Sequence, residues 1–194
     1  EEGSDGKCIS VEWIKISELR GHTRRIRDTW YDSKTQSLFT CSKDKTIQMW
    51  KFSESISSDK KMVGMSVFKH KEVVHYLAYD TNKSILVCGM SNGVMLKSIS
   101  DDRQSVHDKE TILKLPNITC VMYDVARSLL FCGHSKSISI WKLNNLSDYN
   151  MVHELTGLTS EVRILMYDPE EDILYTSSGT FSEPIAVWKN ISTN

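Results

Sequence analysis

The chain is 194 residues long, and 40% of its residues are hydrophobic while 25% are charged. This balance is typical of a soluble globular protein and excludes a largely disordered chain. The 24 basic and 25 acidic residues nearly cancel, so no overall charge draws the chain to nucleic acid or to an anionic membrane. No run of eighteen apolar residues occurs, which excludes a transmembrane helix. We therefore expect no nucleic-acid partner, and membrane binding is not favoured.

The first residues, EEGSDGKC, lack an initiator methionine and the basic-then-apolar pattern of a signal peptide. We interpret them as the start of a partial chain that works inside the cell, in the cytoplasm. The five cysteines are odd in number and form no C-x-x-C pair. They predict free, buried thiols in a reducing compartment.

Residues 1–20 are predicted to form two β-strands. Lys7 to Val11 alternates between polar and apolar residues after the turn signal Ser4-Asp5-Gly6, and Trp13 to Leu19 continues as a second strand. We expect these to be the last two strands of a preceding repeat unit.

The stretch 21–50 begins with Gly21-His22, contains Thr40, turns at Asp44 and ends at Trp50. An imidazole can donate and accept hydrogen bonds, a carboxylate accepts them and an indole N–H donates one. The stretch resembles one blade of the WD-repeat β-propeller family, whose signature is a Gly-His start, a turn aspartate and a closing tryptophan. The resemblance implies a buried structural hydrogen-bond network formed by His22, Thr40, Asp44 and Trp50. Such a network rigidifies a sheet when all its members are paired.

The same unit recurs along the chain, marked by a Tyr-Asp pair at intervals of 44 to 48 residues. This interval is close to the length of a four-stranded blade. Short segments rich in β-branched and aromatic residues, separated by polar turns, predict antiparallel strands rather than helices. The four pairs are Tyr31-Asp32, Tyr79-Asp80, Tyr123-Asp124 and Tyr167-Asp168.

Four copies are predicted, at 21–69, 70–115, 116–156 and 157–194, the last without its outer strand. The signature fades along them: the second copy has Asn92 at the turn and Lys97 near the tryptophan position, while the later two keep Trp141 and Trp188. We expect only the first copy to build the full polar network and the others to depend mainly on apolar packing. The predicted strands of the later copies are 73–79, 85–88, 94–99 and 111–115; 118–123, 129–132, 137–143 and 151–155; and 162–167, 173–177 and 185–189.

His22, Thr40 and Asp44 also have the composition of a catalytic triad. A triad needs an exposed nucleophile beside an oxyanion hole, and the sequence has no nucleophile elbow, Walker loop, dinucleotide fingerprint or zinc-protease motif. Cys132-Gly133-His134 is the one close cysteine–histidine pair, and it lacks the clustered ligands that zinc requires. We therefore predict no catalytic residue, no metal and no cofactor.

The most concentrated charge is a group of arginines on the loop that enters the first copy. Guanidinium groups bind carboxylates and phosphates in bidentate geometry, although most surface charges are only solvated. A phosphoinositide-binding propeller would carry a paired Arg followed by Gly, whereas Ile26 follows here. The candidate partner-contact residues are Arg24, Arg25, Arg27 and Lys43.

Two further features stay open. The loop Ser53–Lys61 is rich in serine, so we expect it to be mobile, and whether it accepts phosphate stays open because such loops are common. Asp28 stands on an inner strand where the later copies have uncharged residues. Its carboxylate must be paired or face the central channel, with Arg163 or a lysine of a neighbouring copy as a candidate partner.

We therefore predict an all-β fold, a β-propeller of four-stranded antiparallel blades with about four blades plus two strands. The resemblance implies a non-enzymatic scaffold that docks other proteins or peptides and supports the assembly of a multiprotein complex. The alternative is a phospholipid- or phosphate-binding propeller that uses Arg24, Arg25 and Arg27. The chain could be part of a longer propeller, which we favour, or a half completed by a second chain. It could also close as a four-bladed ring, with Trp13–Leu19 paired to Ile185–Lys189.

Overall fold

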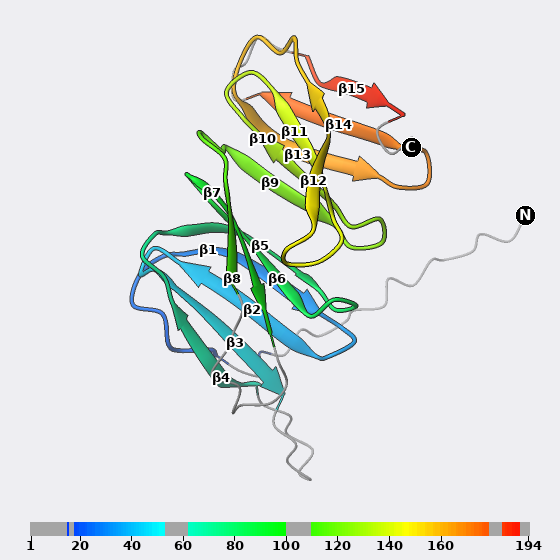
Figure 1. Cartoon of the computed structure of the whole chain (residues 1–194). Helices are drawn as coiled ribbons and strands as arrows, with labels where there is room; N and C mark the ends of the chain where they lie inside the picture. Colours follow the sequence, from blue (N-terminus) through cyan, green and yellow to red (C-terminus); the bar gives the residue numbers. More distant parts are fainter. Residues whose placement is uncertain (1–14, 16–17, 53–61, 100–109, 179–183, 191–194) are drawn as a thin grey trace, which may run out of the picture.

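The fold of the chain, seen in a computed structural model, is a row of antiparallel β-sheets (Figure 1). The structure describes residues 15, 18–52, 62–99, 110–178 and 184–190. Within these residues, three sheets have four strands and the last sheet has three. None of the described residues forms a helix that is long and apolar enough to cross a membrane.

Strand order follows chain order in every sheet, so each sheet is a simple meander. The first sheet contains β1 (Ile26–Asp32), β2 (Ser37–Ser42), β3 (Thr46–Phe52) and β4 (Met62–Lys69). The second contains β5 (Val74–Asp80), β6 (Ile85–Met90), β7 (Gly93–Ser98) and β8 (Glu110–Lys114). The third contains β9 (Cys120–Asp124), β10 (Leu129–Gly133), β11 (Ile138–Leu143) and β12 (Tyr149–Leu155). The fourth contains β13 (Val162–Asp168), β14 (Ile173–Ser178) and β15 (Ala186–Lys189).

The strands predicted for residues 73–189 are confirmed, each to within two residues at either end. The largest shifts include the start of β9, which begins at Cys120 because Ile118 turns its N–H out of the ladder and donates it to the Ser91 carbonyl at 3.3 Å. The two strands predicted within residues 1–20 lie almost entirely outside the described residues.

The four sheets are arranged as an arc, with the first strands of the sheets, β1, β5, β9 and β13, in contact along the inner row (Figure 1). Each gap between neighbouring sheets is filled by a separate apolar core. Phe39 and Leu86 belong to the first core, Leu96 and Leu130 to the second, and Phe131 and Leu174 to the third. The two middle sheets are therefore covered on both faces, which accounts for their nearly continuous apolar strands.

The aspartate of the recurring Tyr-Asp pair stabilises the turn after each inner strand. Its carboxylate accepts backbone N–H groups two or three residues later, and four residues after it the backbone adopts a positive φ between 52° and 56°. A short side-chain acceptor at this position replaces a missing backbone partner in the tight turn. The contacts are Asp32 to Thr35 N at 2.9 Å, Asp80 to Asn82 N at 3.0 Å, Asp124 to Arg127 N at 3.0 Å and Asp168 to Glu170 N at 2.9 Å.

The tyrosine of the pair reaches back to the preceding sheet. The rings of Tyr79 and Phe39 lie 4.9 Å apart, as do those of Tyr167 and Phe131, and the hydroxyl of Tyr123 donates to Asp80 at 2.6 Å. Tyr31 in the first copy has no preceding sheet among the described residues and is 51% exposed. The repeat thus encodes one turn in each unit and, from the second unit onward, one contact with the preceding sheet.

Candidate functional site

The hydrogen-bond network of the first sheet joins the loop before β1 to β2, β3 and the turn between them. The Nδ1 atom of His22 lies 3.1 Å from Asp44 Oδ2, and its Nε2 atom lies 2.8 Å from the Thr40 hydroxyl. That hydroxyl also accepts the indole N–H of Trp50 at 2.9 Å. One assignment satisfies every group: Trp50 donates to Thr40, Thr40 donates to Nε2, and Nδ1–H donates to the carboxylate. The structure therefore brings all four residues together.

The Asp44 carboxylate is surrounded by further donors. It accepts N–H from Thr23 at 2.8 Å and from Thr46 at 2.9 Å, as well as the Thr46 hydroxyl at 2.5 Å. Burial alone would raise the pKa of Asp44, but the hydrogen bonds from Thr46, Thr23 and His22 outweigh it and hold the pKa far below its ordinary value. Thr46 belongs to this network although sequence reasoning missed it. A hydroxyl two residues after the turn aspartate was the available signal.

The same residues are largely buried. The side chains of His22 and Asp44 are 5% and 8% exposed, and Thr40 is buried. Because the Thr40 hydroxyl already bonds both His22 and Trp50, it has no free approach for a substrate carbonyl. The arrangement suits a structural role.

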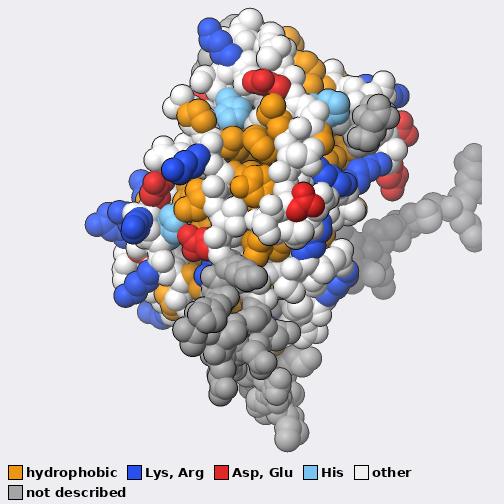
Figure 2. All heavy atoms as spheres, in the orientation of Figure 1, with side chains coloured by type: hydrophobic (Ala, Val, Ile, Leu, Met, Phe, Trp, Pro, Cys, Tyr) orange, Lys and Arg blue, Asp and Glu red, His pale blue; other side chains and the backbone are white. Residues whose placement is uncertain are grey.

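A basic pocket opens at the junction of the first two sheets, with a volume of about 550 Å³. Figure 2 shows Lys and Arg side chains gathered at the left-hand margin of the molecule, where β2 ends and β3 and β5 begin. Three of the four candidate contact residues line the pocket, and Lys45 and Lys71 were not predicted. The side chains that line it are Arg24, Arg27, Lys43, Lys45, Lys71, Glu72, Val73, His75, Ser91 and Asn92.

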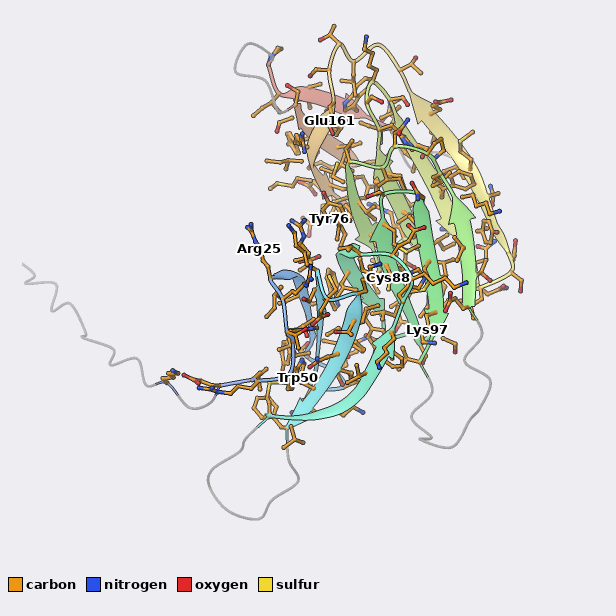
Figure 3. All side chains as sticks on the ribbon, turned by 90° about the vertical axis from the view of Figure 1, so that its left-hand side faces the viewer. Arg25, Trp50, Tyr76, Cys88, Lys97 and Glu161 are labelled. Carbon is orange, nitrogen blue, oxygen red and sulfur yellow. The ribbon has the colours of Figure 1, made fainter. Side chains whose placement is uncertain are left out.

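Two β-bulges lie at this pocket. The register of β1 on β2 shifts between Ile26 and Asp28, and that of β5 on β6 shifts between Val74 and Tyr76. The residues at the two irregularities are Arg27 and His75, and both line the pocket. Bulges redirect side chains at the ends of strands. Arg25 is not among the lining residues and extends outward at the start of the first sheet (Figure 3).

The pocket is strongly positive. It has five basic side chains and one carboxylate, Glu72, which lies 3.4 Å from the Asn92 amide. Burial lowers the pKa of His75, and the charges of Arg27 and Lys43 lower it further. Across the part of the chain that the structure describes, none of the five basic side chains makes a hydrogen bond or an ion pair. This arrangement can bind an anion.

One segment of the chain matches a known family, and the chain as a whole matches known folds. The WD40 family (WD domain, G-beta repeat) matches residues 13–51. The structure is similar to the WD40 beta propeller domain of Doa1, with a TM-score of 0.65 and 18% identity over 90% of this chain and 54% of that one. It is also similar to the Cps50 (Swd1) beta-propeller domain of Myceliophteria thermophila, with a TM-score of 0.64 and 12% identity over 82% and 51%. The chain carries a WD repeat and has the WD40 β-propeller fold.

The propeller identification confirms the predicted fold class, and each sheet is a blade. The chain spans about half the length of the two propeller domains that it resembles. No curated protein sequence matches it.

The third blade has a shorter polar chain of its own, which adds to the apolar packing expected to be the main support of the later blades and includes no carboxylate. The Nε2 atom of His134 lies 2.9 Å from the Ser139 hydroxyl, which also accepts the Trp141 indole N–H at 2.9 Å. Its Nδ1 atom faces the Pro116 carbonyl at 3.1 Å. This histidine follows β10 instead of preceding the first strand, so the linear signature does not reveal it. In the fourth blade, Trp188 donates to the Thr176 hydroxyl at 3.1 Å.

Asp28 joins the first blade to the second through backbone groups. One carboxylate oxygen accepts the Leu77 N–H at 2.8 Å and the other accepts the Thr29 N–H at 2.8 Å. The candidate partner Arg163 pairs with Glu161 at 2.7 Å instead. Burial raises the pKa of Asp28, although both hydrogen bonds act in the opposite direction. No cation is needed to explain this carboxylate.

The cysteines are free and buried at Cys41, Cys88, Cys120 and Cys132, as predicted. Burial raises the pKa of the Cys41 thiol to about 12 and that of Cys120 to about 11, so both are unreactive thiols near neutral pH. Within the described residues, no group of three potential ligands could hold a metal ion. Cys8 and the loop Ser53–Lys61 lie outside these residues.

Proposed function

We propose that this propeller is a non-enzymatic scaffold that docks protein or peptide partners and supports the assembly of a multiprotein complex. WD40 propellers serve generally as platforms for protein interaction, which supports the class of function without naming a partner. The observation that carries the proposal is the basic pocket, which is concave, open to solvent and lined by five basic side chains from two blades. We also propose an intracellular setting, since four free buried thiols suit a reducing compartment.

The absence of catalysis is part of this proposal. It is supported by the burial of His22, Thr40 and Asp44, whose polar groups are hydrogen-bonded to one another. In addition, the buried thiols have pKa values raised by burial, which keeps them protonated.

Affinity capture with charge-reversed variants tests the docking role. The wild-type chain, the pocket variant Lys43→Glu/Lys71→Glu and the control Lys136→Glu would each be immobilised and exposed to lysate of the source cell. Lys136 is an exposed lysine in the turn between β10 and β11, away from the pocket. We expect proteins that bind wild type and control but not the pocket variant, followed by direct binding of the purified partner in calorimetry. Recovery of the same proteins by all three chains, or of none by wild type, contradicts the proposal.

We also propose that a second chain covers the open face of the fourth blade. Met166, Tyr175 and Val187 form one row across β13, β14 and β15, and they are 62%, 36% and 61% exposed. Ile164, which precedes Met166 by two residues in β13, is 59% exposed, and Ile185, just before β15, is 66% exposed. A continuous apolar face beside an edge strand favours association with another sheet.

A further inference from the structure

The five basic side chains of the pocket converge from three separate segments. Arg24 precedes β1 and Arg27 is the second residue of β1. Lys43 and Lys45 belong to the turn between β2 and β3, and Lys71 to the connection between β4 and β5. Their backbones are fixed by N–H donation from Lys43 to the Arg25 carbonyl at 2.9 Å and from His70 to the Lys45 carbonyl at 2.9 Å. The backbone hydrogen bonds thus hold the five cations around one pocket without contacts among their side chains.

This arrangement has an electrostatic cost that an anion would remove. Like charges around one concave surface repel each other, and within the described residues none of the five side chains has a hydrogen-bond or ion-pair partner. The one lining carboxylate, Glu72, contacts Asn92. Asp44 is close in sequence, but its carboxylate is taken up by His22, Thr23 and Thr46. The hollow therefore lacks a sufficient counter-charge of its own.

The number and type of donors favour a phosphate over a carboxylate. A phosphate monoester carries a charge of about −1.5 to −2 at pH 7 and three acceptor oxygens, whereas a carboxylate has one charge and two oxygens. Two guanidinium groups and three ammonium groups can use all of these acceptors. A volume of about 550 Å³ also leaves room for residues that flank the phosphate.

We propose that the basic pocket binds the phosphorylated side chain of a serine- or threonine-containing segment of a partner protein. This inference depends on the proposed docking function and names the ligand that the pocket recognises. Ser91 and Asn92 also line the pocket and offer neutral hydrogen-bonding groups to the backbone of an extended peptide. A flat anionic membrane fits less well, because the cations line a hollow and the chain as a whole has a net charge of −1.

Fluorescence anisotropy with the full chain tests this proposal. The probes are a pool of labelled peptides with a central phosphoserine or phosphothreonine, the same pool without phosphate, and a pool with glutamate at that position. We expect the phosphorylated pool to bind at least about tenfold more tightly than either other pool. Its affinity should fall as salt is raised, because the side chains that bind it are exposed. Lys43→Glu/Lys71→Glu should remove the preference, and Lys136→Glu should keep it.

Several results would overturn the proposal. Equal binding of the three pools would show recognition without phosphate. Failure of the phosphorylated pool to bind, together with binding to vesicles that contain phosphoinositides, would assign the pocket to lipid. Capture of pocket-dependent partners from lysate pretreated with a phosphatase tests phosphate recognition separately from the docking function. Unchanged capture from the treated lysate would refute phosphate recognition and leave the docking function intact. If the wild-type chain captured no protein from untreated lysate, both phosphate recognition and the docking function would be refuted. Circular dichroism of each variant checks that the fold is retained.

Discussion

At the scale of single residues, the network around His22 depends on the one hydroxyl that joins its two halves. Thr40 accepts from Trp50 and donates to His22, so a single proton arrangement satisfies the whole set. Both partners are buried, and water cannot replace a lost bond there. A change at residue 40 therefore leaves more than one polar group unpaired.

We predict that Thr40→Val lowers the free energy of unfolding by about 2 kcal/mol or more, since buried unpaired donors and acceptors cost about 1–3 kcal/mol each. Valine keeps the shape of threonine and removes only the hydroxyl. The control Thr40→Ser keeps the hydroxyl and should lose no more than about 1 kcal/mol for the missing methyl group. Urea denaturation measures both. Similar losses for the two variants would show that the hydroxyl does not join the network.

The acid dependence of stability should report Asp44. Its pKa in the folded chain lies below its ordinary value of 3.8, so the folded state binds fewer protons than the unfolded state. The stabilisation is then complete above pH 3.8 and is lost progressively as the pH falls further. The pKa of Asp32 is also lowered, since the hydrogen bonds from Thr35, Thr81 and Lys34 outweigh its burial, and it acts in the same direction.

We expect urea titrations between pH 2 and pH 7 to show a shallower acid loss for Asp44→Asn than for wild type. The variant should also be less stable at pH 7, because the amide cannot replace an ionised acceptor of four donors. An equal acid slope in both chains would assign the loss to other carboxylates.

Residue types predicted part of the polar network and missed the rest for physical reasons. His22, Thr40, Asp44 and Trp50 could be singled out because they share one linear signature. His134 follows the second strand of its blade, whereas His22 precedes the first strand of its own blade. The Nδ1 atom of His134 faces the Pro116 carbonyl, a contact that the linear signature does not contain. Contacts to backbone groups, such as that of Asp28 with Leu77 N–H, leave no trace in the residue type of the partner.

At the scale of strands, close approach between blades depends on a small residue at the end of β10. A Cβ atom at Gly133 would lie 2.5 Å from Cys120 Sγ and 3.0 Å from the Val162 Cβ atom of the next blade. Gly64 in β4 is different, since a Cβ atom there would meet the Trp50 ring at an ordinary 3.5 Å. The two glycines form a matched pair of strand positions with different surroundings.

We predict that Gly133→Ala destabilises the chain by about 1–3 kcal/mol, the usual cost of overpacking, and that Gly64→Ala changes stability by less than about 0.5 kcal/mol. Thermal unfolding of both variants tests the difference. A small loss of stability in Gly133→Ala would show that Cys120 and Val162 can move away from the added methyl group at little cost in free energy.

The strands themselves were accessible from the sequence, because four copies of one pattern reinforce each other. The described residues of the fourth blade form three strands. The pocket was predicted only in part. Lys45 and Lys71 contribute through the juxtaposition of two blades, and the β-bulges that accompany Arg27 and His75 have no sequence signature here.

At the scale of the whole molecule, the arc is covered in its middle and open at the fourth blade. Apolar cores lie between neighbouring blades, while the outer face of β13–β15 exposes its row of large apolar side chains. Because we propose that a second chain covers this face, we expect a charge introduced there to weaken association more than a charge introduced elsewhere.

We predict that Val187→Lys reduces association of the chain without unfolding it, because this side chain is 61% exposed and a charge there must stay hydrated. Light scattering over a range of concentrations should give a lower mean mass for this variant than for wild type. Asn150→Lys, an exposed position in β12, should behave as wild type. A monomeric wild-type chain at every concentration would contradict the proposal.

The backward reach of the tyrosines has a consequence for how such a chain can grow. From the second blade onward, each repeat contains a tyrosine that contacts the preceding blade. Each of the first three blades in turn contains the residue that the next tyrosine contacts. A unit is therefore joined to its predecessor through its own tyrosine, and to its follower through the residue that the follower's tyrosine contacts. Such a chain can therefore lengthen by complete repeats, whereas an insertion of half a repeat would leave one junction without its partner.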